Sequence, residues 1–203
     1  MTATFPGTDR TIDDRSADIL FHDAHTAYAF TDEPVFEDEL ARIYDLVRQA
    51  PTAVNSQPLR VTFVTSDEAK ARLVPHIAEG NRAKSKSAPV VAILAADTEF
   101  HEHLPRLLPH APNAKDMFAD PSARTQAAMF NATLQAGYFI LAVRAAGLDA
   151  GPMGGIDKIG IDREFFAGTG LTTILVVNIG HVAENGTFPR SPRLEHHEAV
   201  TVL

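Results

Sequence analysis

The chain has 203 residues, of which 45% are hydrophobic, and its formal net charge at pH 7 is -8. This length and apolar content predict a single domain with one substantial core. The sequence contains no cysteine, which excludes disulfides, thiolate catalysis and cysteine-ligated zinc. Lysine and arginine form no stripe, so we do not expect a nucleic-acid partner. No apolar run is long enough to predict a membrane span.

The N-terminal residues are polar and include Pro6 and Gly7. They lack the apolar region of a signal peptide, which leads us to expect a cytoplasmic protein. We expect a loose N-terminal arm over residues 1–13 and one domain over residues 14–203.

Two helices are predicted before the first loop of interest. Residues 16–24 predict a short amphipathic helix, and residues 36–49 predict a longer one. The apolar residues of the longer helix recur at i, i+3, i+4 and i+7: Leu40, Ile43, Tyr44 and Val47. The helix should end before Pro51, because the residue before a proline disfavours helical geometry. A polar loop then extends to Pro58.

The next part of the chain predicts two strands around a helix. Residues 60–65 alternate between apolar and polar, as a strand does. Ser66 is placed to cap a helix over residues 67–74. Residues 89–95 form a continuous apolar run, which favours a strand buried on both faces. Residues 101–121 contain four prolines, so we expect an irregular excursion there.

Residues 123–146 predict a long helix that is apolar around nearly its whole circumference. Such a helix must be buried on all sides, and a subunit interface is one way to achieve this. Gly147 is placed to end it.

The C-terminal part predicts one more helix and two more strands. Asp157 could cap a short helix over residues 157–166. Residues 172–179 predict a buried strand, and residues 198–203 alternate weakly and predict a further strand. Strands interspersed with helices indicate a mixed α/β or α+β domain.

The loop between Pro51 and Pro58 is the first candidate for binding chemistry. Thr52 has a hydroxyl and Asn55 and Gln57 have amides, so the loop can hydrogen-bond a planar polar ligand from several directions. The alternative is an ordinary solvated connection.

Three other short segments could contact a ligand. Glycines in residues 151–155 would let the backbone approach a ligand closely, and the alternative there is a glycine-rich turn. Asn81 and Lys84 share a face if helical, and Lys84 could stabilise an anion. Arg190 and Arg193 could clamp a phosphate. For both pairs the alternative is a solvated surface.

His101, Glu102 and His103 raise the possibility of a metal site. In a strand the two histidines would share a face, but the spacing matches no usual zinc pattern and offers no third ligand. We therefore expect a solvated loop and no metal. The chain also lacks a nucleophile elbow, a P-loop and paired carboxylates, which favours chemistry supplied by a cofactor.

Six segments, in this order, resemble the FMN-dependent nitroreductase family, and within it the malonic semialdehyde reductase (3-hydroxypropanoate dehydrogenase) subgroup. The segments are PTAVNSQPLR, GNRAKSKSAPV, HLPRLLPH, LQAGYFILAVRAAGLDAGPMGG, REFFAGT and FPRSPRL. The resemblance covers residues 16–203. It implies an α+β fold with a central, mostly antiparallel sheet flanked by helices. It also implies an intertwined homodimer with a long buried interface helix and two FMN sites at the interface.

The resemblance assigns the FMN phosphate to a stretch that is rich in basic residues in the family. Here that stretch includes His25, Thr26 and Tyr28, and two of the usual basic positions are occupied by Ala24 and Tyr28. Arg190 and Arg193 match the C-terminal basic pair that also holds the phosphate.

The resemblance also assigns residues around the flavin ring. The loop residues that would reach the flavin of the partner subunit are Pro51, Thr52, Ala53, Asn55 and Gln57. Asn81 and Lys84 would lie beside the ring, with Lys84 facing N1 and O2. The backbone of Pro152, Met153, Gly154 and Gly155 would approach N5. Many family members have a glutamate where this chain has Gly154.

The implied activity is ping-pong hydride transfer from NADPH or NADH, with Lys84 as the catalytic residue that stabilises negative charge on the ring. The subgroup implies reduction of malonic semialdehyde, with Arg60 or Arg106 as candidates for its carboxylate. The alternatives are a broad nitroarene or quinone reductase and a non-catalytic flavin-binding dimer.

Overall fold

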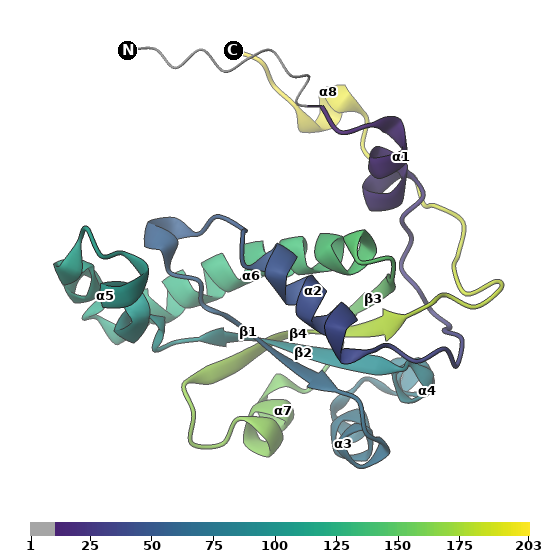
Figure 1. The fold of residues 1–203 in the computed structure, drawn as a ribbon, viewed down its shortest axis with the longest axis horizontal. Coiled ribbons are helices and arrows are strands. Elements are labelled where there is room, and N and C mark those ends of the chain that lie inside the picture. The colour runs from purple at the N-terminus through teal and green to yellow at the C-terminus, as the bar shows by residue number, and fades with distance from the viewer. Residues whose placement is uncertain (1–10) are drawn as a thin grey trace.

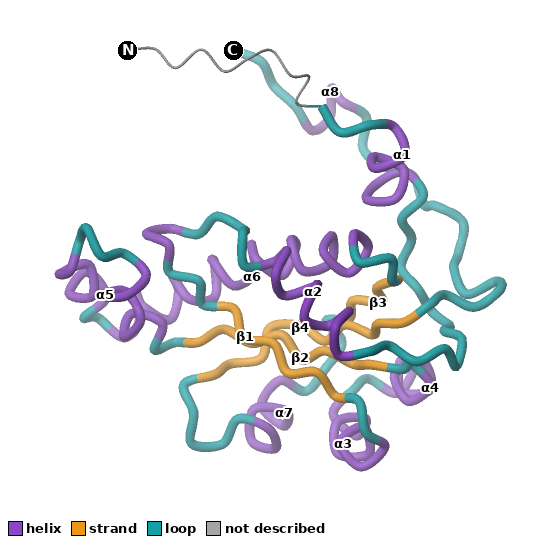
Figure 2. The backbone as a smooth tube through the Cα atoms, in the orientation of Figure 1, coloured by secondary structure: helices purple, strands orange, loops and turns teal. Residues whose placement is uncertain are grey.

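A four-stranded antiparallel sheet forms the centre of the fold, with strand order β1-β2-β4-β3 (Figures 1 and 2). The computed structural model describes residues 11–203. The strands are β1 (Leu59–Val64), β2 (Val90–Asp97), β3 (Asp149–Met153) and β4 (Leu171–Gly180). Every residue of β2 is buried, as its continuous apolar run predicts.

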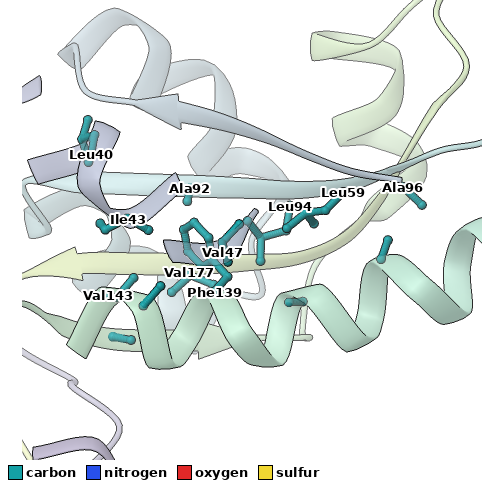
Figure 3. Packing of buried hydrophobic residues seen from close by; sticks show 14 of the residues in the cluster. Leu40, Ile43, Val47, Leu59, Ala92, Leu94, Ala96, Phe139, Val143 and Val177 are labelled. Atoms are coloured by element: carbon teal, nitrogen blue, oxygen red, sulfur yellow. The ribbon is translucent and has the colours of Figure 1, made fainter. Parts of the chain in front are cut away.

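Helices cover both faces of this sheet (Figure 1). One face carries α2 (Glu37–Val47) and α6 (Pro121–Ala145), and the other carries α3 (Asp67–Leu73), α4 (Glu79–Ser87) and α7 (Lys158–Phe165). The larger core cluster lies between the sheet and the α2 and α6 layer (Figure 3). Its labelled members are Leu40, Ile43, Val47, Leu59, Ala92, Leu94, Ala96, Phe139, Val143 and Val177. The expected α+β architecture is confirmed.

Capping residues fix the ends of these helices. The Ser66 side chain accepts a hydrogen bond from Ala69 N, and the Asp157 side chain accepts one from Gly160 N, so both predicted caps are confirmed. Gly147 has φ +89°, a left-handed geometry that ends α6 at little steric cost.

The proline-rich excursion is irregular, as expected. It consists of a 3-10 helix at Phe100–His103, the short helix α5 (Leu104–Leu107) and a second 3-10 segment at Pro112–Phe118.

Two sequence predictions were wrong about strands. The glycine-containing segment, interpreted as a ligand-contacting backbone or a glycine-rich turn, contains part of β3, and Gly151 pairs there with Asn178. A Cβ at Gly151 would lie 2.6 Å from the Ala27 carbonyl oxygen. The glycine therefore allows the backbone at Ala27 to pass close to β3. The predicted C-terminal strand is absent: α8 (His196–Ala199) occupies its start, and residues 200–203 have no regular structure.

The two ends of the described chain run together away from the sheet (Figures 1 and 2). We call residues 11–26 and 187–203 the terminal arm. The helix predicted over residues 16–24 begins earlier, as α1 (Asp14–Ala17), and continues as a π-helix over Asp18–His22. The N-terminal arm expected over residues 1–13 lies mostly outside the described residues.

The long helix α6 is buried along one face only. Its opposite face exposes Phe130, which is 73% accessible, together with Leu134 and Tyr138. A single chain therefore leaves one face of α6 exposed, and the expected burial on all sides would require a second subunit. An exposed row of large apolar side chains on a long helix is typical of a surface that another protein covers.

Candidate functional site

A cavity of about 330 Å³ lies where the terminal arm meets the end of α6. We call it the anion cavity, because three arginines line it: Arg144, Arg190 and Arg193. The other lining residues come from both halves of the arm: Phe21, Ala24, His25, Thr26, Tyr28, Phe188, Pro189 and Ser191. The structure thus brings together two segments that the sequence analysis assigned to phosphate binding, although they lie at opposite ends of the chain.

The arginines of the anion cavity donate hydrogen bonds to backbone carbonyls. Arg190 Nη2 donates to the oxygen of Ala24 at 2.9 Å, and Arg144 Nη1 donates to the oxygen of Leu20 at 3.1 Å. Arg193 Nη1 donates to the oxygen of Ser191 at 2.8 Å. Among residues 11–203, no carboxylate lies within 4.0 Å of any of the three guanidinium groups. Their combined positive charge can therefore attract an anion.

Arg144 is the charged residue of this cavity that the sequence analysis missed. It lies in the last turn of α6 and is half-buried. Burial lowers its pKa, Asp149 opposes this change, and the neighbouring Arg190 lowers the pKa further. Arg144 is the one charged residue between Arg124 and Asp149, and this isolation within an apolar helix was the signal available in the sequence.

His25 is anchored to the other half of the arm. Its Nδ1 lies 3.0 Å from the Phe188 carbonyl oxygen, and a carbonyl can only accept a hydrogen bond. In the neutral ring, Nδ1 must therefore carry the proton, which leaves Nε2 as an acceptor.

Tyr28 links the anion cavity to α4. Its ring packs edge-on against Phe188, with ring centres 4.6 Å apart, and the Lys84 ammonium lies 4.5 Å from the centre of the Tyr28 ring. This is a cation–π contact. Burial lowers the pKa of Lys84. The residue that replaces a basic position of the family thus holds the lysine predicted to be catalytic.

The start of α4 packs against the end of β3. Ala78 N donates to the Gly155 carbonyl oxygen at 2.9 Å, and a Cβ added to Gly155 would lie 3.7 Å from Asn81 Nδ2. Nothing lies within 4 Å of the position of a Cβ at Gly154, so the position where many family members have a glutamate borders open space. Asn81 therefore lies beside Gly155, next to the open space at Gly154.

The remaining residues of that predicted segment are less available to a ligand. Pro152 pairs with Val177 in the sheet. The Met153 side chain is buried, and its sulfur lies 3.7 Å from the Ser85 hydroxyl oxygen. Only the backbone of Met153 could therefore face a ligand.

The loop between Pro51 and Pro58 has a strained backbone. Val54, Asn55 and Gln57 have φ values of 50°, 52° and 42°, and positive φ is costly for a β-branched residue such as valine. Strain of this kind persists only where its surroundings enforce it, and it concentrates at functional sites. Here Gln57 N donates to the Thr52 hydroxyl at 3.1 Å, and Ala53 N donates to Asn131 Oδ1 at 2.8 Å.

One chain does not bring this loop to the other predicted residues. Asn55 Nδ2 donates to the Leu107 carbonyl oxygen in α5, and Gln57 Nε2 donates to Asn55 Oδ1. The loop therefore lies at the α5 end of the sheet, whereas α4, with Lys84, lies at the opposite end (Figure 1). One chain therefore keeps these two groups of predicted residues apart.

A second cavity, of about 810 Å³, lies between the loop, α2 and α5, and its lining includes Gln57, Arg60, His103 and Arg106. Arg60 forms an ion pair with Asp97 and donates to the carbonyl oxygens of two neighbouring residues. No ion pair engages Arg106 among the described residues. Of the two arginines considered for a substrate carboxylate, Arg106 is therefore the one left without an acidic partner.

The histidine-rich segment forms an ion-pair network. The ligand atoms of Glu99, His101 and Glu102 lie within 4.8 Å of one another. However, Glu99 already binds Arg124 at 3.0 Å and Glu102 binds Lys115 at 2.6 Å. Because each carboxylate has a cationic partner, this cluster offers no excess negative charge for a metal ion.

Residues 23–181 match the sequence profile described as the Nitroreductase family. The chain belongs to the nitroreductase family. A relative from Streptomyces coelicolor, provisionally named an NADH dehydrogenase/NAD(P)H nitroreductase, is 57% identical over 182 residues, covering 89% of this chain and 90% of that protein. A relative from Leptothrix cholodnii with the same provisional name is 49% identical over 185 residues, covering 91% and 94% of the two chains.

A solved structure supports the nitroreductase fold. A provisionally assigned nitroreductase from Exiguobacterium sibiricum, in complex with FMN, has a TM-score of 0.83 at 22% identity and covers 97% of this chain and 100% of its own. Within the described residues, no helix has the length and apolar character needed to cross a membrane.

Proposed function

We propose that this nitroreductase-family protein is an NAD(P)H-dependent oxidoreductase that holds FMN as its cofactor. The observation that carries the proposal is the anion cavity, with three arginines and no carboxylate partner, connected through Tyr28 to Lys84. Relatives at 49% to 57% identity are named for NADH dehydrogenase and NAD(P)H nitroreductase activity. The chemistry of the cavity supports a cofactor that carries a phosphate, and the names of these relatives support the class of reaction.

The residues present fit FMN at both of its ends. The arginines and the Thr26 hydroxyl suit a phosphate monoester, which carries about -1.5 to -2 charges at neutral pH. Asn81 offers an amide and Lys84 an ammonium group to the polar edge of the ring. When bound, FMN supplies the group that accepts and donates hydride.

In this proposal, the protein's own groups act by position and charge. The Lys84 ammonium, held against Tyr28, would stabilise negative charge at N1 and O2 of the ring. The open space beside Gly154 would leave room for a nicotinamide and then for the second substrate in turn.

We further propose a homodimer in which the loop at residues 51–58 serves the flavin held by the partner's α4. Two observations support this arrangement. The loop and α4 lie at opposite ends of the sheet in one chain (Figure 1), and Phe130, Leu134 and Tyr138 expose a row of apolar side chains on α6.

The electron acceptor has two candidate classes. The names of the relatives and the open position at Gly154 favour nitroarenes or quinones. The sequence motifs favour malonic semialdehyde, for which Arg106 would provide the carboxylate partner. Steady-state rates with a nitroarene and with malonic semialdehyde separate the two, and Arg106→Gln should raise KM for the aldehyde alone.

The visible spectrum of the purified protein tests the main proposal. We expect a yellow protein with flavin absorbance that is bleached by NADPH or NADH under nitrogen and restored by an acceptor. A protein that binds FMN but is not bleached would support the non-catalytic alternative. A protein that binds no FMN would refute the proposal.

A further inference from the structure

The anion cavity has lost basic residues at positions where the family places them. Ala24 and Tyr28 occupy two of these positions, and the Tyr28 ring is engaged with Lys84. The Nδ1 atom of His25 is already engaged by the Phe188 carbonyl oxygen at 3.0 Å. Because Ala24 and Tyr28 bring no positive charge, the charge that a phosphate dianion needs in this cavity must come from its arginines.

Arg144 supplies a guanidinium group at that place. It lines the same cavity as Arg190 and Arg193, although it comes from a different element, the last turn of α6. The C-terminal end of a helix favours a cation, which helps to explain why a charge is tolerated there. Arg144 lies close enough to Arg190 for the two positive charges to affect each other, and an anion between them would relieve this repulsion.

Its contacts with residues 11–203 leave Arg144 with donors to spare. A guanidinium group has five N–H donors, and the hydrogen bond that involves Arg144 uses Nη1 to reach the Leu20 carbonyl oxygen. Asp149, whose negative charge acts on Arg144, accepts a hydrogen bond from Val182 N at 2.9 Å. Arg144 is therefore half-buried, cationic and only partly satisfied.

We propose that Arg144 is a phosphate-binding residue that replaces the basic groups missing at positions 24 and 28, and that it sets the preference of the protein for FMN over riboflavin. The inference rests on the proposed function, because it assumes that the cavity holds the phosphate of a flavin. Riboflavin has the same ring and lacks the phosphate, so it isolates the contribution of the cavity.

The test measures dissociation constants for FMN and for riboflavin, by flavin fluorescence, with full-length protein freed of flavin. Wild type, Arg144→Gln and Arg144→Lys are compared with Arg163→Gln, a matched control because Arg163 is an exposed arginine of α7. We expect Arg144→Gln to weaken FMN binding by about tenfold to a hundredfold, the range for losing a charged hydrogen bond, with riboflavin affinity unchanged. Arg144→Lys should fall between, because lysine keeps the charge and loses the fork geometry.

Several outcomes would overturn the inference. Arg144→Gln could keep the wild-type ratio of FMN to riboflavin affinity, or lose affinity for both flavins equally, which would indicate a purely structural link to Leu20. If Arg144→Gln fails to fold, Arg144→Lys decides: an unchanged ratio in that variant refutes the inference. A wild type that binds neither flavin would instead refute the proposed function.

Discussion

Asn131 joins the core of the fold to the strained loop at residues 51–58, so replacing it tests how the loop is held. Asn131 is 4% exposed, its Nδ2 donates to the Ala127 carbonyl oxygen, and its Oδ1 accepts from Ala53 N at 2.8 Å. Asn131→Ala removes the acceptor and leaves the Ala53 N–H without a partner. An unpaired buried donor costs about 1–3 kcal/mol.

Two effects reduce this cost. Ala53 is exposed, so water can reach its N–H once the asparagine has gone, and alanine gains about 0.5 kcal/mol over asparagine as a helix former. We therefore expect Asn131→Ala to lower the free energy of unfolding by about 1 kcal/mol. At an m-value of about 2 kcal/mol/M, the urea midpoint should fall by about 0.5 M.

The loop should respond more strongly than the global stability. Each left-handed residue that is not glycine, such as Val54, costs on the order of 1–3 kcal/mol and persists only while its surroundings hold it, so a released loop should relax to other conformations. We expect FMN affinity to fall about tenfold, which corresponds to 1.4 kcal/mol.

Urea unfolding at one protein concentration and FMN titration measure the two effects in the same samples. Thr125→Ala is the matched control, because Thr125 is exposed on the same helix and its hydroxyl donates only to the Pro121 carbonyl oxygen. An Asn131→Ala protein with wild-type midpoint and wild-type FMN affinity would refute the role given to this contact.

Four further substitutions probe other parts of the structure. Gly151→Ala should lower stability by about 1–3 kcal/mol, because its Cβ would lie 2.6 Å from the Ala27 carbonyl oxygen, whereas Gly154→Ala meets open space; equal melting temperatures would contradict this contrast. Lys84→Met should slow flavin reduction by on the order of a hundredfold. Burial lowers the pKa of Lys84 below 10.5. As the pH rises, the ammonium group should therefore deprotonate and the wild-type rate should decrease before pH 10.5 is reached. A rate that stays level up to pH 10.5 would count against this role of Lys84. Phe130→Asp should yield monomers on size-exclusion chromatography, and an unaltered elution volume would argue against an α6 interface.

The sequence predicted those elements whose local pattern has a single physical explanation. β2 is a continuous apolar run, and Ser66 and Asp157 are efficient caps, so none of these depends on distant residues. β3 was missed because Gly151 and Pro152 disfavour strands. Its place at the edge of the sheet explains the exception, since an edge strand tolerates a proline that donates no hydrogen bond.

Other predictions failed because they depend on partners that the local pattern does not reveal. Alternation over residues 198–203 resembles a strand, but the described chain provides no neighbouring strand for it. Arg144 was missed because an arginine in a helix is ordinary until the terminal arm is folded against it. The contact between Tyr28 and Lys84 joins residues from different elements, and Tyr28 alone gave no indication of it.

The loop at residues 51–58 and α4 lie at opposite ends of the sheet in one chain (Figure 1). In the proposed dimer, a substitution in the loop of one subunit and a substitution in α4 of the other would therefore affect the same flavin site. If each flavin takes its loop from one subunit and its lysine from the other, Asn55→Ala and Lys84→Met homodimers each have two damaged sites. A heterodimer of these two variants would concentrate both lesions in one site and leave the other site wild type. Subunit exchange between two inactive preparations would then restore up to half of the wild-type turnover per heterodimer.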